Sequence, residues 1–331
     1  MSRRLYFGID GGGTKTEAVL VDETGLALGG GISGSTNRNH YSKMQIVEHL
    51  TRALKLAAGE IQLDEAEVTI FLGMSGVSTD RDRQDIVGIV REVAMLGGRA
   101  RIGVENDAVA GLIGGLAGAP GMALIAGTGS ICLGVNAKHE QWWAGGWGSM
   151  ADDAGSAPWV GLRAMNAAVR AADGRGKPTK LRDLVFDYLG LSEPRDLIDR
   201  VHNQKFERSD IGALALLVTQ AYLDGDVVAG EILDAAAGEL SQMVSATVKA
   251  LFTDEASPLI YVGGFARSGE PFQPMLTKKI IEDSPTVIIK EPKLSPAHGA
   301  ALEALRLGGV QWTPELIGRL GKKYERRADT D

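Results

Sequence analysis

The sequence predicts an α/β fold of two similar lobes, each with a β-sheet covered by helices. Apolar strands alternate with amphipathic helices along most of the 331 residues, a pattern typical of helix-covered sheets. A strand, a glycine loop and a second strand occur twice, at residues 5–22 and 122–135. Glycine supplies 44 residues, almost twice the usual share of about 7%, in short clusters beside apolar segments. These observations indicate a duplicated fold whose glycine loops face a shared cleft between the lobes.

The first lobe is expected to open with a three-stranded meander. Its first strand, Leu5–Ile9, ends at Asp10, and a glycine loop leads to the second strand, Glu17–Asp22. A third strand is expected at Leu26–Gly30. Apolar residues at helical or strand spacing then predict helices at 41–60, 85–95 and 107–116 and strands at 68–73 and 101–105.

Gly118-Ala119-Pro120-Gly121 interrupts this pattern and is the candidate domain boundary. The predicted lobes are therefore residues 1–118 and 119–331. The second lobe repeats the strand, glycine loop and strand and then turns mostly helical from 158 to 249, with later strands at 259–262 and 287–290 and a helix at 296–307. That last helix is expected either to stay with the second lobe or to pack back on the first.

Composition excludes several classes of protein. The net charge is −7 and no basic face is evident, which argues against a nucleic-acid partner. Cys132 is the one cysteine, so an internal disulfide framework and a four-cysteine zinc site are excluded, and its apolar strand predicts an inert packed thiol. No signal sequence opens the chain and no apolar run approaches a transmembrane length, so no membrane partner and a cytoplasmic location are expected.

The first glycine loop, Gly11-Gly12-Gly13-Thr14, is followed by a strand, which excludes a P-loop and a dinucleotide fingerprint. Bare backbone amides can still converge on a phosphate, with hydroxyl donors from Thr14 and Thr16 and a charge from Lys15. Asp10 fits a magnesium ion bridging a carboxylate and phosphate oxygens. The alternative is a plain hairpin turn with glycine at positive φ.

Two further loops strengthen the phosphate-binding interpretation. Gly127-Thr128-Gly129-Ser130 has the same flanking strands as the first loop, so two hairpins could hold one polyphosphate. Gly263-Gly264-Phe265 follows a buried strand and precedes a helix, where glycine allows the flat approach of a planar base. Each of these segments has a simpler interpretation as an ordinary turn.

At this point the sequence resembles a known superfamily. Asp10-Gly-Gly-Gly-Thr-Lys-Thr16, Ala126-Gly-Thr-Gly-Ser130 and Val262-Gly-Gly-Phe-Ala266 resemble the phosphate-1, phosphate-2 and adenosine segments of sugar kinases, heat-shock ATPases and actin. Within this superfamily the chain is similar to the BadF/BadG/BcrA/BcrD ATPase family, and most closely to its N-acetylglucosamine kinases. The resemblance runs in order from about Gly8 to Ala304. It implies duplicated ribonuclease-H-like, actin-like ATPase domains, with ATP and Mg²⁺ as cofactors and a sugar as substrate.

The resemblance also implies roles for single residues. Asp107 would be the general base that orients the attacking hydroxyl, expected to be O6, although an Asp opening a helix is also a typical N-cap. Asn37 and Asp153 would bind sugar hydroxyls, and Ser75 would line the substituent at C2. The family often has Asp-Glu-Gly-Ser where this chain has Asp153-Ala154-Gly155-Ser156, so the glutamate's hydrogen bond is missing here.

Four tryptophans, Trp142, Trp143, Trp147 and Trp159, lie within 18 residues. An aromatic face suits the apolar face of a pyranose, and Trp147 between two glycines is the chosen ligand contact. Packing in the core or between lobes is expected for at least two of the four.

Three other functions stay open. A glucosamine kinase would use the same scaffold without an acetyl pocket. A BadF-type dehydratase activator would hold an iron–sulfur cluster between subunits, for which one cysteine argues poorly. An ATP-gated interaction module would need extra partner-binding segments, and none is evident. A homodimer is left open as a partner.

Overall fold

A computed structural model describes the chain except for residues 1–2, 39–40, 204–207, 254, 323–325 and 329–331. The chain forms two compact units, of which unit 1 holds residues 1–119 and 291–331 and unit 2 holds residues 120–290. The division after Ala119 lies within the Gly118–Gly121 segment. The predicted second lobe, 119–331, is too long, because residues 291–331 belong to unit 1.

Unit 1 is built on a six-stranded sheet in the order β11-β3-β2-β1-β4-β5. The central strand β1 pairs antiparallel with β2 and parallel with β4. β3 continues the antiparallel meander and runs four residues beyond its predicted end, while β5 and β11 form the edges. The strands are β1 (Arg4–Gly11), β2 (Lys15–Asp22), β3 (Ala27–Gly34), β4 (Glu67–Met74), β5 (Arg101–Asn106) and β11 (Arg326–Ala328).

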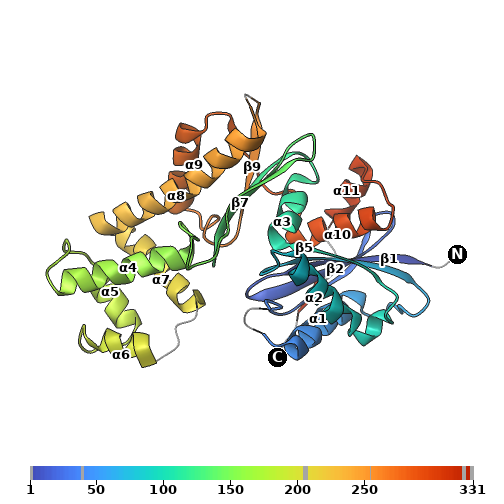
Figure 1. The fold of residues 1–331 in the computed structure, drawn as a ribbon, viewed down its shortest axis with the longest axis horizontal. Coiled ribbons are helices and arrows are strands. Elements are labelled where there is room, and N and C mark those ends of the chain that lie inside the picture. Colours follow the sequence, from blue (N-terminus) through green and yellow to red (C-terminus); the bar gives the residue numbers. More distant parts are fainter. Residues whose placement is uncertain (1–2, 39–40, 204–207, 254, 323–325, 329–331) are drawn as a thin grey trace. The chain divides into compact units, whose positions relative to one another are not determined.

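Helices cover both faces of this sheet (Figure 1). Leu5, Phe7 and Ile9 of β1 pack in a core with α1 and α2, whereas Tyr6, between them, packs in a second core with α10. This alternation follows from the two-residue period of a strand. The helical elements are α1 (Lys43–Ala58), α2 (Asp80–Arg91), the 3₁₀ turn η1 (Ala94–Leu96), α3 (Asp107–Leu116), α10 (Pro296–Leu307) and α11 (Pro314–Leu320).

Glycines explain why α10 belongs to unit 1. A Cβ on Gly8 of β1 would lie 2.2 Å from the carbonyl oxygen of Ala297, and one on Gly299 would lie 2.0 Å from that of Ala110 in α3. The strand and both helices therefore approach each other backbone to backbone, and alanines fill the remaining contacts. A local sequence pattern does not reveal this long-range match between Gly8 and Gly299.

Unit 2 repeats the plan in a five-stranded sheet, β10-β9-β6-β7-β8. Here β6 pairs antiparallel with β7 and parallel with β9, as β1 does with β2 and β4. The predicted duplication of an α/β fold is thus confirmed. The elements are β6 (Gly121–Ala126), β7 (Ser130–Val135), β8 (Gln141–Gly145), β9 (Ser257–Val262), β10 (Val287–Ile289), α4 (Ala157–Ala172), α5 (Leu181–Tyr188), α6 (Asp196–Asn203), α7 (Arg208–Leu223), α8 (Val227–Leu251) and α9 (Phe272–Asp283).

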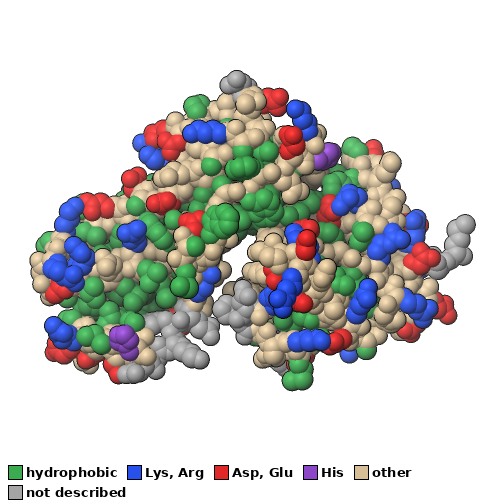
Figure 2. All heavy atoms as spheres, viewed as in Figure 1, with side chains coloured by type: hydrophobic (Ala, Val, Ile, Leu, Met, Phe, Trp, Pro, Cys, Tyr) green, Lys and Arg blue, Asp and Glu red, His purple; other side chains and the backbone are tan. Residues whose placement is uncertain are grey.

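The surface of unit 2 carries exposed apolar side chains over α4, α5 and α7 (Figure 2). Leu162, Tyr188, Leu216 and Leu223 are more than half exposed on these helices. In the part of the chain that the structure describes, no helix combines the length and apolar character needed to cross a membrane.

Candidate functional site

The phosphate-1 loop, Gly12 to Thr14, is a tight hairpin between β1 and β2. The amide of Gly12 donates to the carbonyl of Lys15 at 3.0 Å, while Gly13, Thr14 and Lys15 are exposed. Neither Gly11, Gly12 nor Gly13 has positive φ, so the turn itself does not demand glycine. Gly11 is instead required by close packing, because a Cβ there would lie 2.6 Å from Thr36 Oγ1.

Thr16 does not point its hydroxyl toward the open side of this loop. It is fully buried, and its Oγ1 donates to Thr36 Oγ1 at 3.0 Å. The expectation that the Thr16 hydroxyl contacts phosphate is therefore not met, since β2 turns this side chain into the protein. Lys15 keeps about half its side chain exposed, with its Nζ 3.6 Å from a Glu17 carboxylate oxygen.

Carboxylates gather at the carboxyl end of β1. Asp10 lies opposite Glu17 in the β1–β2 register. Burial, then the negative charges of Asp107 and Glu17, raises the pKa of Asp10 to about 7 against the opposing charge of Lys15. Burial also raises the pKa of Asp107 to about 6, although two backbone N–H groups at the start of α3 favour its charged form. This concentration of negative charge suits a bound cation.

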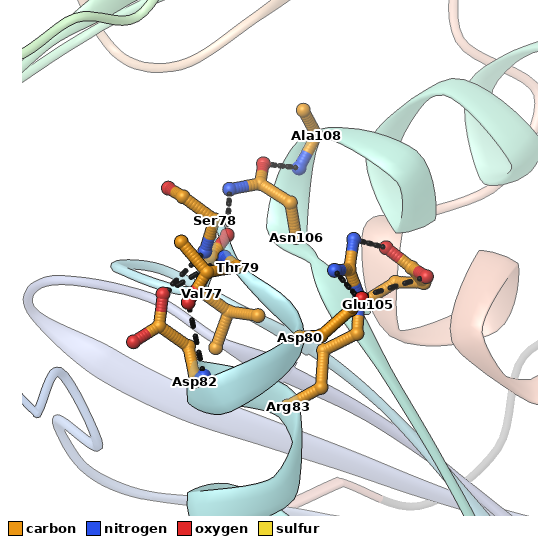
Figure 3. Close-up of polar contacts among 9 residues, drawn as sticks. All are labelled: Val77, Ser78, Thr79, Asp80, Asp82, Arg83, Glu105, Asn106 and Ala108. Atoms are coloured by element: carbon orange, nitrogen blue, oxygen red, sulfur yellow. Dashed lines mark hydrogen bonds and ion pairs between the residues drawn. The ribbon is translucent and has the colours of Figure 1, made fainter.

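Asn106, rather than Asp107, caps α3. Its side-chain oxygen accepts a hydrogen bond from the amide of Ala108 at 2.9 Å, and its side-chain nitrogen donates to the Val77 carbonyl at 2.8 Å (Figure 3). The alternative that Asp107 serves as the N-cap is thus wrong. Asp107 is the first residue of the helix.

An ion-pair network braces the chain just before Asp107. Arg83 of α2 binds both oxygens of Glu105, at 3.1 and 2.9 Å, and also contacts Asp80 at 3.0 Å (Figure 3). Thr79 caps the same helix by accepting from the amide of Asp82. The last residues of β5 are therefore held to α2, which fixes the start of α3. Sequence reasoning missed Arg83, because its partner lies 22 residues away.

Two predicted sugar-binding residues meet in unit 1. The Asn37 side-chain nitrogen lies 3.5 Å from Ser75 Oγ. Next to Asn37, Arg38 binds Asp82 at 2.7 Å and Asp85 at 2.9 Å, which attaches this segment to α2. We call residues 35–38, which follow β3, the acceptor loop, after the sugar-binding role predicted for Asn37.

Among the described residues no group of three or more His, Cys, Asp or Glu side chains is arranged to hold a metal ion. Mg²⁺ in phosphoryl-transfer sites usually needs only one or two protein carboxylates, with phosphate oxygens and waters completing the shell. The partly buried carboxyl of Asp10, with a raised pKa and a glycine loop beside it, fits that limited donor set.

Unit 2 brings its two predicted nucleotide segments together. In the phosphate-2 loop the amide of Gly127 donates to the Gly129 carbonyl at 2.9 Å, and Thr128 is exposed at the tip. The carbonyl of Ala126, just before this loop, accepts from the amides of Phe265 and Ala266. Gly263, at φ +90°, permits this approach, because a Cβ would lie 2.5 Å from the Ala126 oxygen.

The ring of Phe265 is buried and stacks on the ring of Phe272, with 4.3 Å between the two ring centroids. Only the backbone of Phe265 faces the loop. Ser130 is also buried, and its hydroxyl donates to the carbonyl of Ala154 at 2.7 Å. In these two segments of unit 2, Thr128 and Gly264 are the exposed residues.

Asp153 lies against the phosphate-2 loop and is 5% exposed. Its Oδ1 accepts from the amide of Ser130 at 3.3 Å, and its Oδ2 pairs with Arg208, which also donates to the Thr128 carbonyl. Asp153 thus holds the loop and an arginine. The sugar-binding role expected for it stays a prediction. Arg208 carried no sequence signal, since no motif surrounds it.

Tryptophans near the phosphate-2 loop are mostly exposed. Trp147 is 78% exposed between Gly146 and Gly148, both at positive φ, and Trp142 and Trp143 of β8 are also exposed. Core packing, expected for at least two of the four, is found for Trp159, over whose ring the Arg163 guanidinium lies at 4.3 Å. Cys132 is fully buried as predicted, and burial raises its pKa to about 12.

The chain is similar to known proteins over most of its length. Residues 7–304 match the BadF/BadG/BcrA/BcrD ATPase family. The N-acetyl-D-glucosamine kinase of Dictyostelium discoideum is 32% identical over 92% of this chain and 99% of its own. The N-acetylmuramic acid/N-acetylglucosamine kinase of Clostridium acetobutylicum is 31% identical over 91% of this chain and 98% of its own.

Solved structures show the same fold. A Chromobacterium violaceum protein, provisionally named N-acetylglucosamine kinase, has a TM-score of 0.70 at 25% identity and covers 93% of this chain and 99% of its own. A glucokinase of the ROK family from Streptomyces griseus, solved with glucose and AMPPNP, has a TM-score of 0.52 at 18% identity, covering 90% and 98%. The predicted α/β fold of sugar-kinase type is thereby confirmed.

Proposed function

The chain belongs to the BadF/BadG/BcrA/BcrD ATPase family, and from that premise we propose that it is an ATP-dependent amino-sugar kinase acting on N-acetylglucosamine. The observation that carries the proposal is the closeness of Asp10 and Asp107 within unit 1 beside a glycine hairpin. Asp10 pairs with Gly73 in the β1–β4 register, and a Cβ on Gly73 would lie 3.4 Å from the Cα of Asp107. Both side chains are partly buried and both carboxyls have a raised pKa. One carboxylate suits a metal-bound phosphate and the other suits an attacking hydroxyl.

ATP would be bound mainly by backbone. The exposed amides of Gly13 and Thr14, with the charge of Lys15, suit the terminal phosphates. In unit 2 the phosphate-2 loop and the neighbouring Gly263-Gly264 suit a phosphate and the flat face of a base. Asp10 would hold the magnesium ion, which neutralises phosphate charge during transfer.

Asp107 would act as the general base. A sugar hydroxyl within hydrogen-bond reach of its carboxylate would be oriented toward the γ-phosphorus, and its proton would pass to the carboxylate as the new P–O bond forms and the bond to ADP breaks. A carboxylate with a pKa of about 6 is ionised at neutral pH and so is ready to accept that proton. Asn37 and Ser75 would bind neighbouring groups of the sugar, and O6 is the proposed acceptor.

The relatives support an amino sugar as the acceptor, since two are named for N-acetylglucosamine and a third, matching 55% of this chain, is named a glucosamine kinase of Vibrio cholerae. Trp147, exposed and flanked by two glycines at positive φ, is the proposed aromatic contact in unit 2. An iron–sulfur activator role has little support, because Cys132 is fully buried.

ADP release with ATP and Mg²⁺ tests the proposal on N-acetylglucosamine, glucosamine, N-acetylmuramic acid and glucose. We expect kcat/KM for N-acetylglucosamine to exceed that for glucosamine by about tenfold or more, because an acetamide-binding site rejects analogues that leave its polar groups unpaired. Carbon–phosphorus coupling at C6 of the product would identify O6. ADP release with glucosamine but not with N-acetylglucosamine would favour the glucosamine kinase. ADP release that no sugar increases would overturn the proposal.

A further inference from the structure

The hydroxyl of Ser35 joins the acceptor loop to the phosphate-1 loop. Ser35 is 1% exposed. Its Oγ accepts from the backbone amide of Asn37 at 3.2 Å and donates to the carbonyl of Gly12 at 2.9 Å. One buried atom therefore links a candidate sugar-binding residue to the loop that is proposed to hold phosphate.

A second path runs parallel to the first. The Asn37 side chain lies 3.5 Å from Ser75 Oγ, and the Ser75 amide donates to the carbonyl of Gly11 at 2.8 Å. The two sugar-site residues are thus connected to consecutive carbonyls, that of Gly11 at the end of β1 and that of Gly12 in the phosphate-1 loop. Beneath them the buried bond from Thr16 to Thr36 ties β2 to the acceptor loop.

Those carbonyls matter because a peptide unit is planar. Fixing the direction of the Gly12 carbonyl also fixes the N–H of Gly13, which lies in the same plane and points the opposite way. The Gly12 N–H is already used by Lys15 within the hairpin. The Ser35 bond therefore orients the amide that is exposed at the tip of the loop.

We propose that Ser35 is a positioning residue through which occupancy of the acceptor-sugar site orders the phosphate-1 loop for ATP. The inference rests on the proposed function and deepens it. A sugar bound to Asn37 restrains that residue, Ser35 then holds the Gly12 carbonyl, and the Gly13 amide stays aimed at phosphate. Sugar and nucleotide consequently tighten each other's binding by the same factor.

Calorimetry measures the factor by which bound sugar tightens the binding of nucleotide. The Kd of a non-hydrolysable ATP analogue with Mg²⁺ is determined with and without saturating N-acetylglucosamine. We expect the wild-type protein to bind the analogue at least about fivefold more tightly with sugar present. In Ser35→Ala the ratio should fall to within about twofold of unity. The ratio is informative because a merely structural loss would raise the Kd of the analogue by the same factor with and without sugar.

Ser33→Ala is the matched control. Ser33 lies on β3, two residues before Ser35, and is 5% exposed, but its hydroxyl has no hydrogen-bond partner among the described residues. This variant should keep the wild-type ratio. If Ser35→Ala does not fold, Thr16→Val removes the neighbouring link while preserving shape, and its ratio should also fall.

An unchanged ratio in the Ser35 variant, or an equal loss in the Ser33 control, would overturn the coupling. Either result with normal sugar phosphorylation leaves the kinase proposal intact. A wild-type protein that binds and phosphorylates none of the sugars would overturn both.

Discussion

At the scale of single residues, Asp107 combines a partly buried side chain with a position in the first turn of α3. Replacing it with asparagine keeps the size of the side chain and an oxygen for the helix N–H groups, but removes the proton acceptor. We expect Asp107→Asn to lower kcat at least about 100-fold, the usual contribution of a general base. Steady-state ADP release measures this, with circular dichroism as the control for folding. Near-normal turnover would remove Asp107 from the mechanism.

The same substitution should stabilise the ligand-free protein. The pKa of Asp107 rises from 3.8 to about 6 on folding, so the folded state binds the proton more tightly than the unfolded state does. Stability is therefore lost as pH rises from about 4 to about 6, and it stays lower at higher pH. Asp10 adds a loss of the same sign up to about pH 7.

Asp107→Asn removes this penalty. Without ATP or Mg²⁺ its Tm should exceed that of the wild-type protein by a few degrees at pH 8, and the difference should shrink toward pH 4. Differential scanning fluorimetry across this pH range measures it. A variant less stable than wild type at pH 8 would contradict the assigned burial of the carboxyl.

Single residues also show what a sequence reveals and what it does not. Asp10 was singled out because it stands at a strand end beside a glycine loop, whereas the roles predicted for Asp107 and Asn37 came from the family resemblance. The N-cap residue of α3 was misassigned because Asn and Asp are both favoured N-caps. Only the hydrogen bond from the amide of Ala108 to the Asn106 side chain distinguishes Asn106 from Asp107. Arg208 and Arg83 were missed because each acts across a long sequence separation on a partner that no motif names.

At the scale of elements, helix α10 shows packing opposing helix propensity. Alanine forms helices better than glycine, so Gly299→Ala would stabilise an exposed helix by about 0.5–1 kcal/mol. Here the added Cβ would lie 2.0 Å from the Ala110 oxygen and 2.5 Å from the amide of Gly114. Backbone cannot move away as a flexible side chain can, so we expect destabilisation by about 1–3 kcal/mol.

Gly88 of α2 is the control for this prediction. It is exposed, and a Cβ there would meet nothing within 4 Å. Gly88→Ala should therefore stabilise the protein by about 0.5–1 kcal/mol. Urea unfolding of both variants measures the two opposite signs. The close packing of α10 on α3 would be contradicted if both substitutions stabilised.

Elements with strong periodicity were predictable, and those fixed by distant contacts were not. α3 and α10 begin and end at the predicted residues, because each has a clear start signal and an apolar run. β8 was not expected, since its tryptophans are exposed and the strand is defined by pairing with β7. β11 was also missed, because three residues paired with β3 leave no pattern of their own.

At the scale of the whole molecule, the two units differ in how the chain builds them. Unit 2 is one continuous segment, 120–290, and its core is drawn from that segment alone. Unit 1 is discontinuous, because the core beside Tyr6, Val19 and Val21 is completed by α10 and α11. A fragment ending at residue 119 would leave this apolar face exposed to water.

We therefore expect residues 120–290 to fold cooperatively alone, and residues 1–119 not to fold. The contacts also supply a rescue, because the amides of Lys293 and Leu294 donate to the carbonyls of Gly115 and Gly114, which brings the ends at Ala119 and Glu291 near each other. A short glycine–serine linker joining 1–119 to 291–331 should restore a folded unit 1. Thermal unfolding by circular dichroism, with amide proton dispersion by NMR, tests all three chains. Folding of 1–119 without the later segment would show that α10 is dispensable to unit 1.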